Sequence, residues 1–204
     1  MGYVATMVLA YLLGCSNMAI YIAKYKKVDL RSGGSGNPGA SNATILMGWG
    51  AGILVAIHDI GKAYLAVLLA KLLFPELPAI EEVAGVACVL GHVFPFYLKF
   101  KGGKGFASYL GMTLALNWKF AVVVMVIVLL VTLITDYIVV GTFTTIIVVP
   151  TYMGIVTHSF LVAAILCVGT AVIFYKHREN IVRIWKGTEI GLRSTARGEH
   201  RADK

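Results

Sequence analysis

Long apolar segments with almost no charge alternate with short polar segments along the whole chain. This alternation predicts seven membrane-spanning helices, at about residues 3–23, 43–74, 83–98, 106–116, 120–135, 137–152 and 158–175. Helices are expected because a spanning segment must satisfy its own backbone hydrogen bonds in lipid. The fourth segment is short for a span, and Asp136 alone separates the fifth from the sixth. We therefore expect an all-α, polytopic integral membrane protein with a single domain over residues 1–204.

The lysines and arginines are distributed very unevenly between the two sides that this topology defines. Residues 24–31, residues 99–104 and a basic tail at about 176–204 carry nearly all of them and fall on one side, whereas Lys71 and Lys119 fall on the other. Positive loops are retained in the cytoplasm. We therefore expect an N-terminus outside, a cytoplasmic C-terminus, and cytoplasmic polar loops.

Composition supports a membrane protein and argues against several other classes. The chain is 58% hydrophobic and 14% charged, and its mean hydropathy is +0.81. The net charge of +8 lies beside apolar spans, so anionic lipid explains it better than nucleic acid does. Cys15, Cys88 and Cys167 lie inside apolar runs and are expected to be core residues. Without a carboxylate cluster or a Gly-x-Ser-x-Gly motif, we expect neither a metal or other cofactor nor a covalent serine mechanism.

The polar segment Lys99–Gly105 contains three lysines and three glycines. Glycines let backbone N–H groups point toward a ligand, and lysines add charge, so the segment is typical of an anion-binding loop. The alternative is a topology-determining positive loop, which needs charge but no glycines. His92, shortly before this loop, is expected to be a hydrogen-bonded packing residue or, as the alternative, a participant in catalysis.

Two further polar segments fall on the same predicted side. Residues 35–42 combine glycines with Ser and Asn before a predicted helix, which suits an anion at the helix start or, alternatively, an ordinary capped turn. After the last span, His177, Asn180 and Arg183 are spaced to share one helix face, toward the site or toward lipid phosphates. Two glycine-rich loops beside an apolar body suggest two phosphorylated substrates, one of them with an acyl chain.

Charged residues also occur inside the second predicted span. Asp59 and Lys62 are three residues apart and can pair on one face, with His58 beside them. Charges at this depth are costly and face the protein interior. The first interpretation is a structural ion pair, and the second is support for a substrate-binding lysine.

With these motifs, the sequence resembles the acyl-phosphate:glycerol-3-phosphate acyltransferases of bacterial membranes over nearly its whole length. The motifs are Gly34–Asn42, Gly91–Gly105 and His177–Glu189. The resemblance implies a multi-pass protein of the bacterial inner membrane with a cytoplasmic active site. It also implies transfer of a fatty acyl group from acyl phosphate to the 1-hydroxyl of glycerol 3-phosphate, giving lysophosphatidic acid and phosphate. A soluble enzyme that makes acyl phosphate is the implied functional partner.

The resemblance also assigns the site residues. Those expected to be catalytic are Ser35, Lys104, His177 and Asn180. Those expected to bind substrate or phosphate are Gly36, Asn37, Gly39, Ser41, Asn42, His92, Lys101, Gly102, Gly103, Gly105, Thr142 and Arg183. We expect direct attack in a ternary complex. Lys101 and the Gly102 and Gly103 amides are expected to stabilise the departing phosphate or the oxyanion, and His177 or a substrate phosphate oxygen is expected to be the base.

The sequence departs from the family pattern at several positions. Ile45 replaces an arginine, Ala63 replaces a glycine, and Thr142 stands where a serine is common; the first span has Cys15-Ser16-Asn17 where Ser-Ile-Pro is usual. These departures keep two alternatives open. One is the same donor with a different acceptor. The other is a phosphate-ester transporter or anion-binding membrane protein without chemistry.

Overall fold

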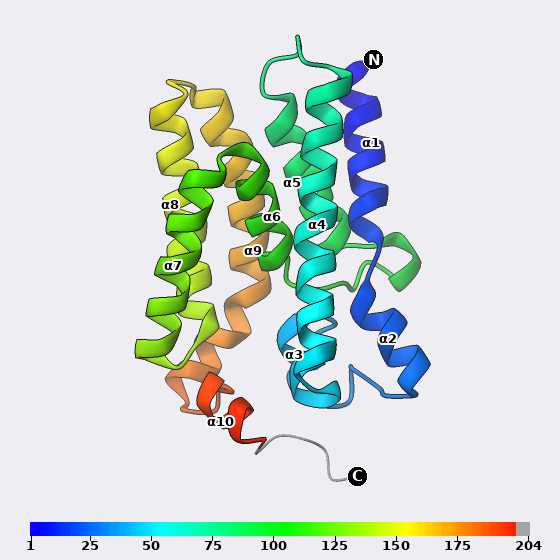
Figure 1. The fold of residues 1–204 in the computed structure, drawn as a ribbon, viewed down its shortest axis with the longest axis vertical. Coiled ribbons are helices and arrows are strands. Elements are labelled where there is room, and N and C mark those ends of the chain that lie inside the picture. Colours follow the sequence, from blue (N-terminus) through cyan, green and yellow to red (C-terminus); the bar gives the residue numbers. More distant parts are fainter. Residues whose placement is uncertain (199–204) are drawn as a thin grey trace.

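The computed structural model describes residues 1–198, and all of their regular structure is helical. The helices are α1 (Gly2–Cys15), α2 (Met18–Lys26), α3 (Ala40–Met47), α4 (Trp49–Leu73), α5 (Ile80–Val93), α6 (Phe106–Leu116), α7 (Trp118–Thr135), α8 (Ile138–Val156), α9 (Phe160–Trp185) and α10 (Leu192–Arg197), with a short 3-10 turn at Phe96–Leu98. The all-α prediction is confirmed. Most helices run along the long axis, with the start of α1 at one end and α10 at the other (Figure 1).

Six segments are long and apolar enough to cross a membrane: Gly2–Lys26, Trp49–Leu73, Ile80–Leu98, Trp118–Thr135, Ile138–Val156 and Phe160–Trp185. α6 is apolar but has only 11 residues, a length of roughly 16 Å where a bilayer core is about 30 Å thick. The helices expose large apolar side chains, as Leu72, Ile134 and Phe160 illustrate. Such a surface suits lipid and would be costly in water.

Two predicted spans are divided in the structure. The expected continuous helix 43–74 is wrong, because Gly48 adopts φ +89° and separates α3 from α4. The first span breaks between α1 and α2, where the side chain of Asn17 caps α2 by accepting a hydrogen bond from Ile20 N at 3.1 Å. Because of these breaks, the short helices α2 and α3 flank the polar segment between residues 27 and 39.

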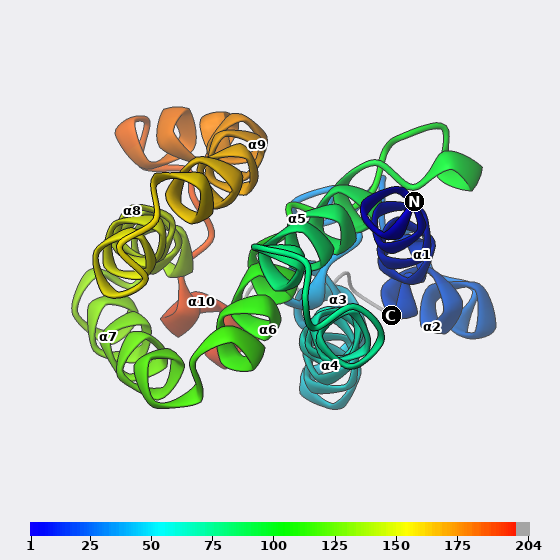
Figure 2. The same cartoon turned by 90° about the horizontal axis from the view of Figure 1, so that it is seen from above.

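α5 and α6 lie between the other helices and connect them. Seen from above, α1–α4 lie on one side of this pair and α7–α9 on the other (Figure 2). The largest core cluster joins α5, α6, α8 and α9 through fully buried side chains, among them Val89, Tyr109, Ile146 and Ile173. α6 also packs closely on α4, because a Cβ atom at Gly111 would lie 2.1 Å from the carbonyl oxygen of Ile60.

This close contact predicts a difference between two glycines. Gly111→Ala should force α4 and α6 apart and destabilise the fold by about 1–3 kcal/mol, the usual cost of overpacking. Gly61→Ala is the matched control, because no atom lies within 4 Å of a Cβ added there. Thermal unfolding in detergent measures both variants. Equal melting temperatures for the two variants would contradict the packing described here.

Candidate functional site

A buried lysine links three helices beneath the polar loops. Lys62 Nζ on α4 lies 2.8 Å from Asp59 Oδ1, lies 2.8 Å from Nδ1 of His92 on α5, and donates a hydrogen bond to the carbonyl oxygen of Ser16 at 2.7 Å. His58 adds contacts of 3.0 Å to Ser16 Oγ and 3.3 Å to Asp59 Oδ1. The predicted Asp59–Lys62 pair is thus confirmed, and it belongs to a larger polar cluster in which the charges are paired inside the bundle.

The lysine–glycine loop lies directly on this cluster. The N–H groups of Gly102 and Gly103 donate to the carbonyl oxygens of Val93 and His92, at 3.0 and 3.1 Å. A Cβ atom at Gly103 would lie 2.1 Å from His92 Nε2. The expectation that these two amides bind an anion is therefore wrong, since both hydrogens are used within the protein. The two glycines allow the loop to pass tightly over the end of α5.

Lys104 follows these glycines and extends toward α9. Its Nζ donates to Asn180 Oδ1, and Asn180 Nδ2 donates to Glu189 Oε1 at 2.5 Å. Glu189 also accepts from Arg183 Nε at 2.6 Å. Burial lowers the pKa of Lys104 to about 8, and the nearby Arg183 guanidinium adds to the effect. The ammonium group is thus held in place and poorly hydrated, which strengthens its attraction for an anion.

His177 lies one helical turn before Asn180 and is almost completely buried. Its Nδ1 is 2.9 Å from the carbonyl oxygen of Ile173. A carbonyl oxygen can only accept, so Nδ1 carries the hydrogen and Nε2 of the neutral ring keeps its lone pair. This tautomer leaves Nε2 able to accept a proton or a hydrogen bond.

The side chain of Asn42 holds the backbone of the loop before α3 through two hydrogen bonds. The Asn42 side chain is fully buried, accepts from Ser35 N at 2.8 Å and donates to Leu30 O at 2.8 Å. Asn17, at the α1–α2 break, donates to Pro38 O at 3.2 Å. Both contacts hold the backbone of the loop, so Asn42 lies behind the site as a supporting residue.

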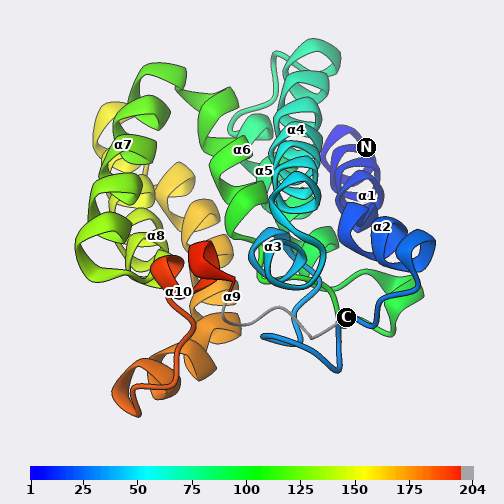
Figure 3. The ribbon, with the colours of Figure 1, turned by 60° about the horizontal axis from the view of Figure 1, so that its bottom comes forward.

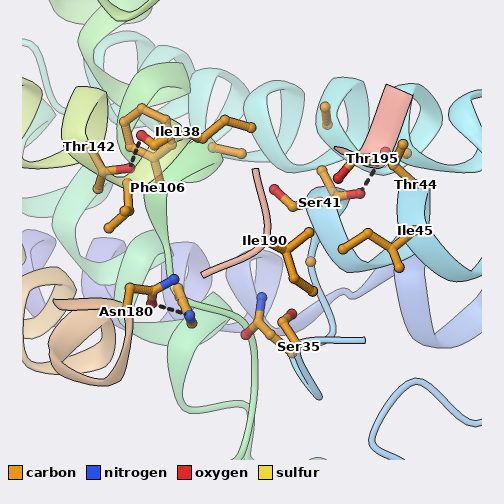
Figure 4. A pocket seen from close by; sticks show the side chains of 18 of the residues that line it. Ser35, Ser41, Thr44, Ile45, Phe106, Ile138, Thr142, Asn180, Ile190 and Thr195 are labelled. Carbon is orange, nitrogen blue, oxygen red and sulfur yellow. Dashed lines mark hydrogen bonds between the residues drawn. The ribbon is translucent and has the colours of Figure 1, made fainter. Parts of the chain in front are cut away.

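A cavity of about 320 Å³ collects most of the predicted site residues (Figure 4). Its lining includes Ser35, Asn37, Gly39, Ser41, His92, Lys104, Gly105, Thr142, His177 and Asn180. The three polar segments that are far apart in the sequence therefore meet at one place. Of the other predicted binding residues, Gly36, Lys101 and Gly102 line a second cavity beside it, whereas Asn42, Gly103 and Arg183 line neither cavity.

The sequence did not indicate two parts of the cavity wall. One part is formed by α3 and α4, with Thr44, Trp49, Gly52, Ile53 and Ala56. The other is the C-terminal segment, which contributes Ile190, Gly191, Leu192 and Thr195. Ile190 lies between Asn180 and Ile45 in Figure 4. The sequence signal that could have indicated this wall is the pair of apolar residues, Ile190 and Leu192, within an otherwise basic tail.

The C-terminal segment is fixed to the loop between α7 and α8. Leu192 N donates to Asp136 O, and Arg193 N donates to Asp136 Oδ1, both at 2.8 Å. Arg193 Nη2 also reaches Leu133 O at 2.8 Å. These bonds hold α10 between α3 and α8–α9 (Figure 3). Asp136, expected only to separate two spans, thereby fixes one wall of the cavity.

The fold and the cavity define a class: a polytopic helical membrane protein with one polar-and-apolar cavity near one end of its helices. A family model described as glycerol-3-phosphate acyltransferase matches residues 4–187. The chain belongs to the glycerol-3-phosphate acyltransferase family, as the resemblance predicted.

Relatives and solved structures agree with this assignment. The chain is 35% identical to glycerol-3-phosphate acyltransferase 1 of Oceanobacillus iheyensis, over 95% of this chain and 97% of the relative. It is also 35% identical to the glycerol-3-phosphate acyltransferase of Thermoanaerobacter pseudethanolicus, over 93% and 95%. The crystal structure of PlsY (YgiH), an integral membrane glycerol 3-phosphate acyltransferase in its glycerol 3-phosphate form, is 34% identical and superposes with a TM-score of 0.89 over 96% of this chain and 98% of that one.

The lowered pKa of Lys104 predicts a pH dependence of anion binding. The lysine is charged below its pKa, so binding should be constant below pH 8 and should weaken above about pH 8, by up to tenfold per pH unit. Sulfate is a suitable probe because it does not titrate in this range. Lys104→Arg should keep sulfate affinity constant over the same range, because arginine stays charged. Identical pH profiles for the wild type and Lys104→Arg would exclude Lys104 as the titrating group.

Proposed function

We propose that this protein transfers a fatty acyl group from acyl phosphate to the 1-hydroxyl of glycerol 3-phosphate, giving lysophosphatidic acid and inorganic phosphate. Membership of the acyltransferase family supports acylation. The PlsY structures described as the glycerol 3-phosphate form and the lysophosphatidic acid form support this acceptor and this product. The choice of acyl phosphate as donor rests on the sequence motifs and on the chemistry of the cavity.

One observation carries the proposal: the same cavity is lined by charged and polar groups that can bind phosphate and by apolar side chains that can contact an acyl chain. Lys104 supplies positive charge, Ser35, Asn37 and Ser41 supply polar groups, and Trp49, Ile53, Phe106 and Ile138 supply apolar surface. A substrate with an acyl chain and a phosphate needs both kinds of surface within one molecule's length. Phosphate is a good leaving group, so positioning can provide much of the rate enhancement.

The mechanism is direct attack in a ternary complex. The 1-hydroxyl oxygen of glycerol 3-phosphate forms a bond to the acyl carbonyl carbon, and the bond from that carbon to the phosphate oxygen breaks. The hydroxyl proton passes to Nε2 of His177 or to a phosphate oxygen of the substrate. Lys104, held by Asn180, binds phosphate, and Ser35 contributes a hydroxyl donor from the opposite loop.

The same proposal includes an orientation of the chain in the membrane. α6 serves as a short seventh crossing, because the chain reverses direction before and after it (Figure 1). The Lys- and Arg-rich loops lie at the end of the bundle that carries the cavity, which supports a cytoplasmic site and an external N-terminus. We expect the inner membrane of a bacterium, with acyl phosphate supplied by a soluble enzyme.

The reaction can be tested with purified protein in detergent, given acyl phosphate and glycerol 3-phosphate without added metal. We expect lysophosphatidic acid and phosphate in equal amounts. Lys104→Ala should lower kcat/KM by about tenfold to a hundredfold, as expected from loss of a charged hydrogen bond. Lys119→Ala, at the start of α7, is the matched control and should retain activity. Phosphate release without lysophosphatidic acid would indicate another acceptor, and no turnover would favour an anion-binding protein without chemistry.

Ile45 provides a test of the acceptor. It is 6% exposed and lines the cavity where the family pattern has arginine. Ile45→Arg adds a guanidinium group that can bind phosphate, so the KM for glycerol 3-phosphate should fall several-fold if this is the natural acceptor. Ile45→Met is the control for side-chain length and should leave KM unchanged. An unchanged KM in Ile45→Arg would favour a different acceptor.

A further inference from the structure

A short segment of the chain, Glu189–Arg193, crosses the end of the first cavity and is held at both ends; we call it the strap. At its first end, Glu189 accepts hydrogen bonds from Asn180 Nδ2 at 2.5 Å and from Arg183 Nε at 2.6 Å. Both donors lie on α9, and Asn180 also accepts from Lys104. The family model ends at residue 187, so the strap lies outside the residues that it matches. The proposed mechanism assigns no role to the strap.

At its second end, the strap is fixed to the turn between α7 and α8. Leu192 N donates to Asp136 O, and Arg193 N donates to Asp136 Oδ1, both at 2.8 Å. Gly191 is buried against the same residue, because a Cβ atom there would overlap the Asp136 carboxylate. The φ of Gly191 is −82°, which any residue can adopt. The contact with Asp136, and not the backbone conformation, therefore favours glycine at this position.

Between its two ends, the strap presents apolar side chains to the cavity. Ile190 and Leu192 both line it, and Ile190 lies between Asn180 and Ile45 (Figure 4). The helix that follows, α10, lies between α3 and α8–α9 (Figure 3). On its outer side the strap carries Arg193, whose side chain is 64% exposed. The strap therefore has an apolar side toward the cavity and a charged side away from it.

The chemistry of the donor gives such a cover a purpose. An acyl phosphate can react with water as well as with an alcohol. In the reaction with water, the water oxygen bonds to the acyl carbonyl carbon, the bond from that carbon to the phosphate oxygen breaks, and the released proton passes to phosphate or solvent. The products are a fatty acid and phosphate, and the acyl group is lost. Closing a site against water prevents such a side reaction.

We propose that the strap closes the first cavity at the end that carries the polar loops and keeps water from the acyl carbonyl carbon. The acceptor hydroxyl then receives the acyl group in preference to water. Asp136 and Gly191 are positioning residues, because they hold the strap in place, and Ile190 and Leu192 form the face that covers the acyl group. The identity of the shielded group as acyl phosphate rests on the proposed function.

Two variants release the strap in different ways. Asp136→Gly removes the acceptor of the Arg193 N–H group, and glycine tolerates the φ of +71° at this position. Gly191→Ala displaces the strap or the carboxylate by overlap. Loss of a hydrogen bond to a charged group should raise the open fraction of the strap about tenfold. Hydrolysis of acyl phosphate without acceptor should rise by the same factor, and with glycerol 3-phosphate present the variants should release more phosphate than lysophosphatidic acid.

Two further variants serve as controls. Asp136→Asn keeps an oxygen that can accept from Arg193 N, and asparagine also tolerates a positive φ, so this variant should keep the wild-type ratio of phosphate to lysophosphatidic acid. Gly50→Ala is the matched glycine control, because no atom lies within 4 Å of a Cβ added there and Gly50 lines neither cavity. Thermal unfolding of each variant guards against a folding defect.

Access of solvent to the cavity can be measured without turnover. Ala56→Cys places a thiol in the cavity lining on α4, and Cys167→Ser removes the exposed native thiol, which leaves Cys15 and Cys88 buried. The protein is placed in lipid nanodiscs, so that a charged methanethiosulfonate reagent reaches the cavity from water and not through lipid. The introduced thiol should react about tenfold faster in the two released-strap variants than in the wild type and the two controls.

The two measurements together decide the proposal. Faster labelling with an excess of phosphate over lysophosphatidic acid supports it. Equal labelling rates in the released-strap variants and the controls would overturn it, and so would an unchanged product ratio despite faster labelling. If the wild type does not turn over acyl phosphate, the proposed function fails, and the labelling rates still decide whether the strap closes the cavity.

Discussion

A single ammonium group inside an apolar bundle requires partners, and Lys62 finds them on its own helix, on α5 and at the break between α1 and α2. An unpaired charge at this depth would cost several kcal/mol. Lys62 is compensated by Asp59 on its own helix, by His92 on α5 and by the Ser16 carbonyl at the α1–α2 break. The carbonyl is available because Asn17 interrupts the helix there and begins α2. The relative positions of α1, α4 and α5 are thereby linked through one nitrogen atom.

Both polar loops are attached to this cluster. Gly103 packs against the His92 ring, and its N–H donates a hydrogen bond to the His92 carbonyl oxygen. The position of the neighbouring Lys104 therefore depends on the position of His92. Asn17, adjacent to Ser16, donates a hydrogen bond from its side chain to the Pro38 carbonyl oxygen in the other loop. A disturbance of Lys62 would therefore reach both sides of the cavity, although Lys62 lines neither cavity. The cluster acts on the site by positioning the loops.

The sequence allowed the long helices, the Asp59–Lys62 pair and the meeting of three polar segments to be predicted, because apolar runs, helical spacing and charge bias are local signals. The sequence did not predict that the Gly102 and Gly103 N–H groups donate to carbonyl oxygens of the protein itself. Glycine spacing is the same whether the N–H groups face a ligand or face the carbonyls of His92 and Val93. The cavity wall formed by Ile190 and Leu192 also depends on a hydrogen bond from Leu192 N to the carbonyl oxygen of Asp136. These two residues are far apart in the sequence, so no local sequence pattern indicates the contact.

Under the proposed function, the first cavity holds two substrates of opposite solubility. An acyl chain gains free energy against Trp49, Ile53, Phe106 and Ile138, and added positive charge there would oppose its burial. A phosphate group gains free energy from the ammonium group of Lys104, which lines the same cavity and is held by Asn180. In that proposal Lys104 holds the phosphate, and the apolar residues of the same lining are left to the acyl chain.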